Sequence, residues 1–454
     1  MPLYKEDNFL IIYPSSKTTV FSFGLSDSLS PPQFRIPSIV YQNTTTKVYQ
    51  SAPNEQTIEI YPIAQNKIVD LDAFNHLLKI ILQSIINKHP TITINQIPML
   101  LIIPSLTWSR SALEYITKYV IEILEITAFN IVDLSLAATF GAGQLTNSTV
   151  VYVDHESIQV VPVVGYQAIK FAGKLINGEG GVTIDRELKK FLPNLRDSQL
   201  DDFKDSGIYE VLIDQNEQSG LDEVQEFDVA KIVTDENGKS IDEVDKDEVD
   251  ASKANRELEK NFFIDSQTQE KIWVGKERFS GTSPLIKLIS KSIYSSLLLI
   301  PDIDRRQDCY DNIILVGSVF KIPGLKEAVL LKLTQDYLVT EPTAHDQELE
   351  SQSGVNVAIM KYQQADEVND GENQQSNTSQ VPNLIKLAKF ADYFPEWKKP
   401  KELGGSWQDV YFLGGQIYGK QIFSGSSHHH GKELFVGSDM YEERGPQSIW
   451  DASI

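Results

Sequence analysis

The segment Phe9-Leu-Ile-Ile-Tyr-Pro-Ser-Ser-Lys-Thr-Thr-Val-Phe-Ser-Phe23 decides the fold of this chain, and Thr149-Val-Val-Tyr-Val-Asp-His-Glu-Ser-Ile-Gln-Val-Val-Pro-Val163 repeats its pattern. In each segment, two apolar and β-branched runs flank a short polar turn, which is typical of a β-hairpin. Apolar strands alternate with helical stretches after each hairpin. We therefore expect an α/β protein made of two halves that each begin with a hairpin.

The composition describes an acidic, folded protein. The 454 residues include 41 Lys and Arg against 63 Asp and Glu, which gives a net charge of −22, and 41% of the residues are hydrophobic. That apolar fraction supports a substantial core and excludes global disorder. Because binding to a nucleic-acid backbone needs clustered Lys and Arg, we expect no direct specific DNA binding. A basic peptide or protein is the favoured kind of partner.

Several classes of site are excluded by what the sequence lacks. Cys309 is the only cysteine, so neither an intramolecular disulfide nor a cysteine metal cluster can form. No run of about 18 uncharged apolar residues is present, and we expect no membrane partner. The three histidines His428-His-His430 lie between Ser and Gly residues and are typical of a surface loop. No metal site is predicted.

Two stretches interrupt the α/β pattern. Residues 201–260 contain 20 acidic and 7 basic residues, too much charge of one sign to pack, and we interpret them as an acidic mobile insertion. Residues 364–380 are rich in Asn, Gln, Asp and Glu and are predicted to be a disordered loop. A docking site for basic tails, including histone tails, is the functional alternative for the insertion.

Four segments resemble actin, and they occur in the same order along the chain. In chain order, they are Glu277–Phe279, Asp302–Gly317, Tyr411–Ile417 and Tyr441–Trp450. The last two hold the sequences Tyr-Phe-Leu-Gly-Gly-Gln-Ile and Tyr-Glu-Glu-Arg-Gly-Pro-Gln-Ser-Ile-Trp. The chain is thereby identified as a member of the actin superfamily. Within that superfamily, Leu384–Lys399 and Gly445–Asp451 are similar to the actin-related proteins of chromatin-remodelling complexes.

This resemblance implies a particular fold. It is the duplicated, two-lobed α/β fold of the actin, Hsp70 and hexokinase type, with a cleft between the lobes. Residues 1–148 and 389–454 would form the first lobe, and residues 149–388 the second. The acidic insertion would then be an excursion from the second lobe.

The resemblance also allows the nucleotide site to be checked, beginning with the first hairpin. In actins a glycine-rich turn presents backbone N–H groups to the phosphates. The matching residues here are Tyr13, Pro14, Ser15, Ser16 and Lys17. Tyr13 replaces a carboxylate that organises the metal ion, and Pro14 lacks an N–H group. Lys17 is interpreted as a surface residue of the turn.

The other parts of that site are also altered. In the second hairpin Asp154 persists, but Glu156 places negative charge where a phosphate would lie. Leu134 or Ser135 takes the position of a glutamine that orients water in actins. At the adenosine side, Gly317 is followed by Ser318 in place of a second glycine, and Gly317 is interpreted as a turn residue. We therefore predict a pseudo-ATPase with no catalytic residues, no metal, and weak or absent ATP binding.

If the cleft is chemically silent, function lies on the surface. Actins accept an amphipathic helix in a groove next to their C-terminal element. The candidates for that partner-helix groove here are Phe140, Gly143, Gly165, Tyr166, Tyr418, Ile422 and Phe423. The alternative interpretation is that these aromatic residues belong to the core.

The partners implied by the resemblance are nuclear. They are the basic helicase/SANT-associated helix of a remodeller ATPase, actin-related protein 7, and the other subunits of a SWI/SNF- or RSC-type complex. The predicted role is protein–protein interaction that regulates transcription, by coupling the ATP use of the partner to DNA translocation. The alternatives are an ATP-binding actin-like ATPase and a filament-forming cytoskeletal protein.

Overall fold

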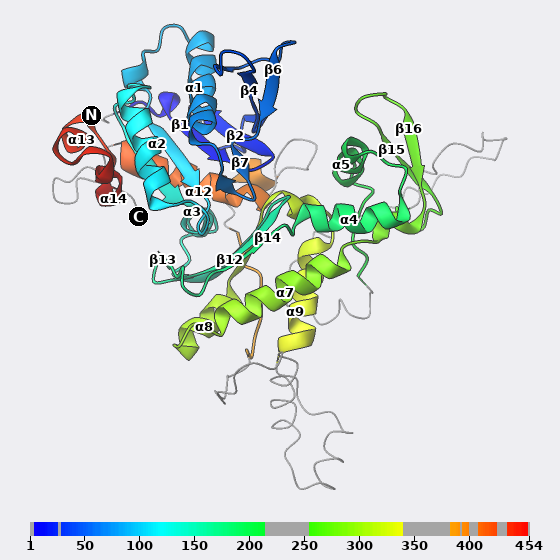
Figure 1. Cartoon of the computed structure of the whole chain (residues 1–454). Helices are drawn as coiled ribbons and strands as arrows, with labels where there is room; N and C mark the ends of the chain where they lie inside the picture. The colour runs from blue at the N-terminus through cyan, green and yellow to red at the C-terminus, as the bar shows by residue number, and fades with distance from the viewer. Residues whose placement is uncertain are drawn as a thin grey trace. The chain divides into compact units, whose positions relative to one another are not determined.

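The chain folds into two compact units in a computed structural model (Figure 1). The model describes residues 4–25, 29–213, 254–338, 382–390, 393–398, 407–424 and 434–452. Unit 1 contains residues 1–181, 292–319 and 337–454, and unit 2 contains residues 182–291 and 320–336. The predicted loop 364–380, the histidines at 428–430 and most of the predicted acidic insertion lie outside the described residues.

The first hairpin belongs to a five-stranded sheet in unit 1. Strands β1 (Leu10–Pro14) and β2 (Thr18–Phe23) form the predicted hairpin, and β3 (Phe34–Pro37) follows at one edge. On the other side of β1, strands β9 (Met99–Ile103) and β10 (Phe129–Asp133) run parallel to it. The order is β10-β9-β1-β2-β3.

The second hairpin has the same surroundings. Strands β11 (Asn147–Val153) and β12 (Ser157–Val164) are antiparallel, and β17 (Ile313–Val316) runs parallel to β11. Two short strands, β13 (Gln167–Ala168) and β14 (Lys174–Asn177), pair with β12. The prediction of an α/β protein with two hairpin-led sheets is confirmed at this level.

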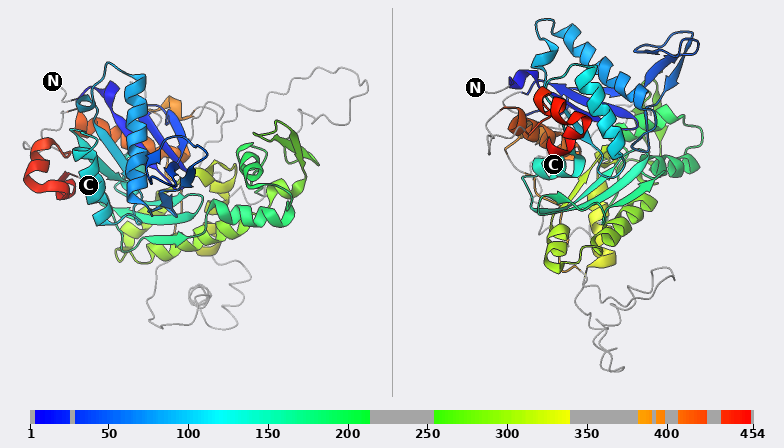
Figure 2. Two further views of the ribbon diagram at one scale, coloured as in Figure 1. Left: turned by 45° about the horizontal axis from the view of Figure 1, so that its top comes forward. Right: turned by 60° about the vertical axis from the view of Figure 1, so that its left-hand side comes forward.

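Alternation along the strands explains how the first sheet is covered on both faces. Leu10 and Ile12 face a cluster that includes α1 (Leu71–Lys88) and α2 (Arg110–Glu122). Ile11 and Tyr13 face a second cluster. Because both faces of these strands are buried, the strands are apolar without interruption. Figure 2 shows α1 and α2 along the outer side of this sheet.

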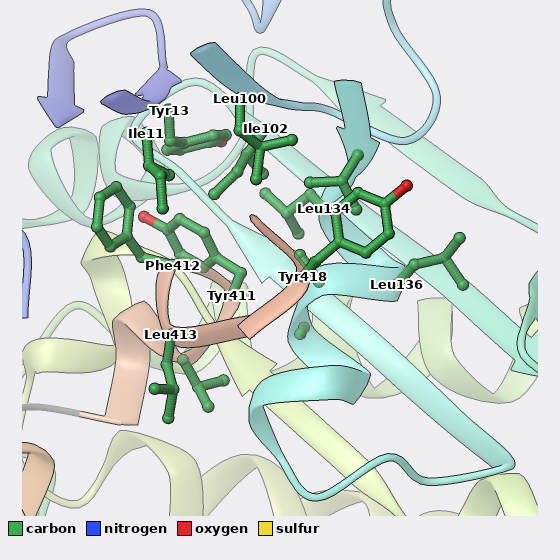
Figure 3. Packing of buried hydrophobic residues seen from close by; sticks show 14 of the residues in the cluster. Ile11, Tyr13, Leu100, Ile102, Leu134, Leu136, Tyr411, Phe412, Leu413 and Tyr418 are labelled. Carbon is green, nitrogen blue, oxygen red and sulfur yellow. The ribbon is translucent and has the colours of Figure 1, made fainter. Parts of the chain in front are cut away.

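The second cluster is built around two helices that lie against both sheets. They are α3 (Leu134–Gly141) and α12 (Val410–Phe423), and Figure 3 shows their side chains packing with those of β1 and β9. A Cβ atom on Gly414 would lie 1.6 Å from the carbonyl oxygen of Ala137, and one on Gly141 would lie 2.2 Å from that of Val410. The two helices can therefore approach this closely only through glycines.

Smaller elements complete unit 1. A three-stranded sheet and a two-stranded hairpin follow β3, and short helices occur near Asp302 and at the C-terminal end. These elements are β4 (Val40–Asn43), β5 (Tyr49–Gln50), β6 (Thr57–Ile60), β7 (Ile63–Ala64), β8 (Lys67–Ile68), α8 (Ile303–Asp311), α13 (Ser438–Arg444) and α14 (Ile449–Ala452).

Unit 2 has its own core, in which Phe203, Tyr209 and Phe263 pack ring against ring. Its elements include α5 (Asp197–Asp205), the hairpin β15 (Asn261–Ile264) and β16 (Lys271–Val274), most of α4 (Gly181–Phe191) and α9 (Leu325–Tyr337), and the first part of α7 (Ser283–Leu297). Residues 201–205 of the predicted insertion therefore belong to a helix, and Phe203 anchors that helix in the core because it is fully buried. An excursion at this place can begin only after α5.

The compact units do not follow the predicted lobes. Both hairpin-led sheets lie in unit 1, because α3 and α12 join them into one core. A compact unit is defined by contacts in the folded structure, whereas the predicted lobes are defined by a pattern that occurs twice in the sequence. The lobe boundaries therefore stay a prediction. No helix in the described ranges is long and apolar enough to cross a membrane.

Candidate functional site

The turn of the first hairpin binds its own backbone. The Ser15 amide and hydroxyl both donate to the carbonyl oxygen of Thr18, over 3.1 Å and 2.9 Å. Ser15 is buried, whereas the side chain of Lys17 is exposed. The turn lacks glycine, and Pro14 has no N–H group to offer. Ser15 and Thr18 thus close the turn, and the loss of a phosphate-binding row of N–H groups stays a prediction.

The turn of the second hairpin contains a charge that the protein itself satisfies. The carboxylate of Glu156 accepts a hydrogen bond of 3.0 Å from the backbone N–H of Gln65. A phosphate oxygen accepts backbone N–H groups in the same way. The Glu156 carboxylate is thus held by a backbone N–H group of the β7–β8 hairpin.

One asparagine, from the tip of the β7–β8 hairpin, links both turns. The backbone N–H of Asn66 donates to the hydroxyl of Ser16 over 2.8 Å, and the side-chain amide of Asn66 donates to the hydroxyl of Ser157 over 2.9 Å. The backbone carbonyl oxygen of Asn66 accepts hydrogen bonds from Thr107 and Trp108. Asn66 is fully buried and has a φ of 56°, a left-handed conformation that asparagine tolerates better than most residues. We call this set of contacts the Asn66 clasp.

Three tyrosine rings fill the space behind the turns. Tyr13 lies with its ring centroid 4.7 Å from that of Tyr411 and 5.9 Å from that of Tyr152. All three are at most 3% exposed, and burial raises the pKa of each phenol well above its usual value. The phenols are therefore neutral and contribute packing. Figure 3 shows Tyr13 and Tyr411 within the cluster between β1 and α12.

The acidic groups near these rings are buried as well. Asp154 is 4% exposed, and burial is the main reason why the pKa of its carboxyl is raised. The hydroxyl of Ser318 donates to Asp154 over 3.4 Å. Asp409 accepts from the Tyr411 hydroxyl over 3.2 Å and pairs with Arg35 at 2.6 Å. Within the described residues, no three His, Cys, Asp or Glu side chains gather as a metal site would require.

Packing accounts for Gly317. Its φ is 113°, and a Cβ atom there would lie 2.2 Å from the carbonyl oxygen of Val153. Its N–H donates to the carbonyl oxygen of Gln408 over 2.9 Å. This glycine is required by its close approach to β11, as turn chemistry had suggested.

The position expected to orient water holds an apolar side chain. Leu134 is 2% exposed and belongs to the core cluster, where Figure 3 shows it near Ile102. Ser135 is fully buried and donates its hydroxyl to Asp133 over 2.6 Å. Leu134 has no hydrogen-bonding group and the hydroxyl of Ser135 is engaged with Asp133, so the loss of a water-orienting side chain stays a prediction.

The candidates for the partner-helix groove fall into two groups. Tyr418, Ile422 and Phe423 are at most 3% exposed and belong to the core, so their side chains cannot line a surface. Phe140 is half-buried and stacks on Tyr418 with centroids 5.9 Å apart. The interpretation of these aromatic residues as core is thus the better one for α12.

The other candidates lie at the surface near the end of α3. No atom lies within 4 Å of a Cβ atom built on Gly143 or on Gly165, and Tyr166 is 44% exposed. The backbone brings them together, because the Tyr166 N–H donates to the carbonyl oxygen of Thr146 over 3.2 Å. Gly143, Gly165 and Tyr166 therefore stay predictions for a contact surface.

Sequence reasoning missed the residues that fill the space around the turns. Gln65, Asn66, Tyr152 and Tyr411 come from segments far from the first hairpin. The pair Gln65-Asn66, which lies between short apolar segments, was the available signal, because such a pair is typical of a hairpin turn. No local signal shows where that turn is placed.

These features define a mixed α/β protein in which two hairpin-led sheets share one core and the hairpin turns are bound by the protein's own groups. No protein-family model matches the chain. The chain is 24% identical, over 552 aligned positions, to the SWI/SNF and RSC complexes subunit arp9 of Schizosaccharomyces pombe (strain 972 / ATCC 24843), and the alignment covers 99% of both proteins. The chain is thus similar to arp9 along its whole length, and the resemblance found in its sequence is confirmed.

Proposed function

We propose that this protein is a non-catalytic subunit of a nuclear chromatin-remodelling complex of the SWI/SNF or RSC type. The observation that carries the proposal is the similarity to the fission-yeast subunit, which extends over 99% of both chains. Similarity along the whole length favours a shared overall role over the borrowing of one domain. The two hairpin-led sheets support the further proposal of an actin-like, duplicated fold with lobes at 1–148 with 389–454 and at 149–388.

The chemistry of the hairpin turns supports a role without ATP hydrolysis. The Asn66 clasp and Glu156 engage groups of both turns, and three buried tyrosines fill the space behind them. A triphosphate would have to displace these contacts and desolvate itself next to two buried carboxylates, Asp154 and Asp409. We therefore propose weak or absent ATP binding, no bound metal and no enzymatic activity.

The proposed partner is the basic helicase/SANT-associated helix of the remodeller ATPase, bound together with actin-related protein 7. The net charge of −22 favours association with a basic helix. Clamping that helix would couple the ATP use of the motor to DNA translocation. The exposed Tyr166, next to Gly165, is the residue of this chain that we assign to the contact.

Affinity purification of the tagged full-length protein, followed by mass spectrometry, tests the proposal. A co-purifying remodelling ATPase together with a second actin-like subunit is expected. Tyr166→Ala should reduce the yield of the ATPase, whereas the control Tyr61→Ala should not, because Tyr61 is similarly exposed at 52% but lies in another segment. Recovery of the protein without any remodelling subunit would contradict the proposal.

Two further measurements address the alternatives. Calorimetric titration with ATP and Mg²⁺ should show no binding at micromolar affinity, and such affinity would favour an actin-like ATPase. Sedimentation of the purified protein should leave it in the supernatant, and a pellet that grows with concentration would favour a filament-forming protein. In a reconstituted remodeller that lacks this subunit, translocation should be less well coupled to ATP use.

A further inference from the structure

A cavity of about 260 Å³ lies in unit 1 beside the N-terminal end of α3, and we call it the Asp133 cavity. Its walls are mainly apolar or aromatic, its floor holds a carboxylate and a hydroxyl, and two cationic side chains reach it. The lining residues are Ile103, Pro104, Ser105, Trp108, Arg110, Leu113, Ile131, Asp133, Lys170 and Trp450. The hairpin turns do not line it.

Asp133 is the unusual group of this cavity. Its side chain is 6% exposed. One carboxylate oxygen, Oδ1, accepts hydrogen bonds from Ser105 and from the amide and hydroxyl of Ser135. The other oxygen, Oδ2, is buried and has no hydrogen bond. A buried carboxylate oxygen normally accepts a hydrogen bond, because removing a charged oxygen from water without a replacement donor costs free energy.

A surface lysine lies next to Oδ2. The Lys170 ammonium lies 3.4 Å from Oδ2, and the Lys170 side chain is 60% exposed. An ion pair with one exposed partner contributes little to stability. The lysine can therefore leave the carboxylate at small cost when a better donor arrives.

The aromatic wall of the cavity already binds a cation. The guanidinium of Arg110 lies 4.7 Å from the ring centre of Trp450, within the range of a cation–π interaction. The indole N–H of Trp450 donates to Glu114 over 2.8 Å, and that of Trp108 donates to the carbonyl oxygen of Asn66 over 3.0 Å. Both indole rings are thus held in place in the absence of a ligand.

We propose that the Asp133 cavity binds one arginine side chain of a basic partner segment. The guanidinium donates to Oδ2 of Asp133, and its aliphatic stem packs against Trp108 and Trp450. Arginine fits better than lysine because the planar guanidinium presents several N–H donors in one plane, which matches the geometry of a carboxylate. Lys170 is the protein's own occupant of the cation position. The inference rests on the proposed function, in which the partner is basic.

The test uses the full-length protein and an alanine-based peptide in which a single arginine is the only charged side chain. Intrinsic tryptophan fluorescence and calorimetry measure binding at physiological ionic strength. Peptides with citrulline or lysine in place of the arginine are the ligand controls, since citrulline has nearly the same shape but no charge. The variants are Asp133→Asn, which keeps a good helix cap, and Lys170→Met, which keeps an apolar stem but removes the competing cation.

Asp302→Asn is the matched control variant. Asp302 caps α8 by accepting the N–H of Arg305, as Asp133 caps α3 by accepting that of Ser135. Both substitutions remove one negative charge from a helix cap in unit 1. Melting temperatures of all variants show whether the fold is retained, and the comparison is made only between variants that melt like the unaltered protein.

We expect saturable, one-to-one binding of the arginine peptide and binding of the citrulline peptide that is weaker by about tenfold or more. Asp133→Asn should weaken arginine binding by about tenfold, Lys170→Met should strengthen it several-fold, and Asp302→Asn should leave it unchanged. Equal binding of the arginine and citrulline peptides, or equal effects of Asp133→Asn and Asp302→Asn, would overturn the proposal. Tighter binding of the lysine peptide would also overturn it.

The failure of this inference is separable from that of the proposed function. If the arginine peptide does not bind but remodelling subunits still co-purify with the protein, only the assignment of the Asp133 cavity is lost. If no remodelling subunit co-purifies, the proposed function is lost whatever the peptide does.

Discussion

The crossing of α3 and α12 offers the sharpest test of how this protein is held together. The substitution is Gly414→Ala, which adds one methyl group at the point of closest approach. Its Cβ atom would lie 1.6 Å from the carbonyl oxygen of Ala137, and contacts under 3.0 Å essentially do not occur. The obstacle is backbone, so no side-chain rotation relieves it, and the helices must separate by at least 1.4 Å.

That separation has a cost that can be bounded. Overpacking of a well-packed core costs about 1–3 kcal/mol when side chains can shift, and here the backbone of two helices must move. Alanine is favoured over glycine within a helix by about 1 kcal/mol, and this gain offsets part of the cost of moving the helices. We expect a net loss of about 3 kcal/mol or more in the free energy of unfolding, a large part of the stability of an ordinary domain.

Two neighbouring glycines of α12 provide graded controls. A Cβ atom on Gly415 would lie 2.6 Å from the end of the Ile102 side chain, which can rotate, and one on Gly419 would have no neighbour closer than 3.5 Å. Gly415→Ala should therefore cost about 1 kcal/mol, and Gly419→Ala should be neutral or stabilising by up to about 1 kcal/mol. Urea unfolding followed by circular dichroism measures all three. Equal stabilities of the Gly414→Ala and Gly419→Ala variants would refute this account of the crossing.

Three further predictions concern single buried polar groups. Asn66→Ala should lower the free energy of unfolding by about 1–2 kcal/mol, because the side-chain hydrogen bond to the second turn is lost and alanine disfavours positive φ. Asn66→Gly loses only the hydrogen bond and should lower the free energy of unfolding by less in the same urea titration. Arg278 is fully buried and donates to the carbonyl oxygens of Leu258 and Gly275, so Arg278→Met should cost about 3 kcal/mol or more and should speed proteolysis near residue 258, and unchanged cleavage would contradict this. The raised pKa of Asp154 means that the folded protein holds this proton more tightly than the unfolded chain does, so the stability it contributes is present below about pH 4 and is lost as the pH rises. Asp154→Asn, which resembles the protonated form, should gain stability relative to the unaltered protein between about pH 4 and pH 7, and a difference that is constant with pH would show that burial does not perturb this group.

Local patterns predicted the elements that carry the fold. Apolar and β-branched runs on either side of a short polar turn placed both hairpins. Such patterns are reliable because a strand buried on both faces has few alternatives. The sequence also led to the interpretation of Tyr13, Pro14 and Ser15 as replacements for the carboxylate and glycine residues of an actin turn, which stays a prediction.

The sequence could not determine which residues would fill the space around those turns. Asn66 lies about 50 residues from Ser16 and 91 from Ser157, and no periodicity reports contacts at such separation. The same holds for α12, whose candidates Tyr418, Ile422 and Phe423 looked like a groove but are core residues. Most of α12 is buried, although Gln421 is exposed, and only the contact with α3 and both sheets showed which of its side chains belong to the core.

By itself, then, the sequence determined the class of fold and the acidic character, and it predicted a degenerate phosphate site. The tertiary structure decided what surrounds the hairpin turns, namely the Asn66 clasp, the buried tyrosines and a carboxylate bound to a backbone N–H. The physical reason is that hairpins and helices follow from the spacing of apolar residues along the chain. The partners of a buried polar group depend on which distant segments the folded core brings within hydrogen-bonding distance.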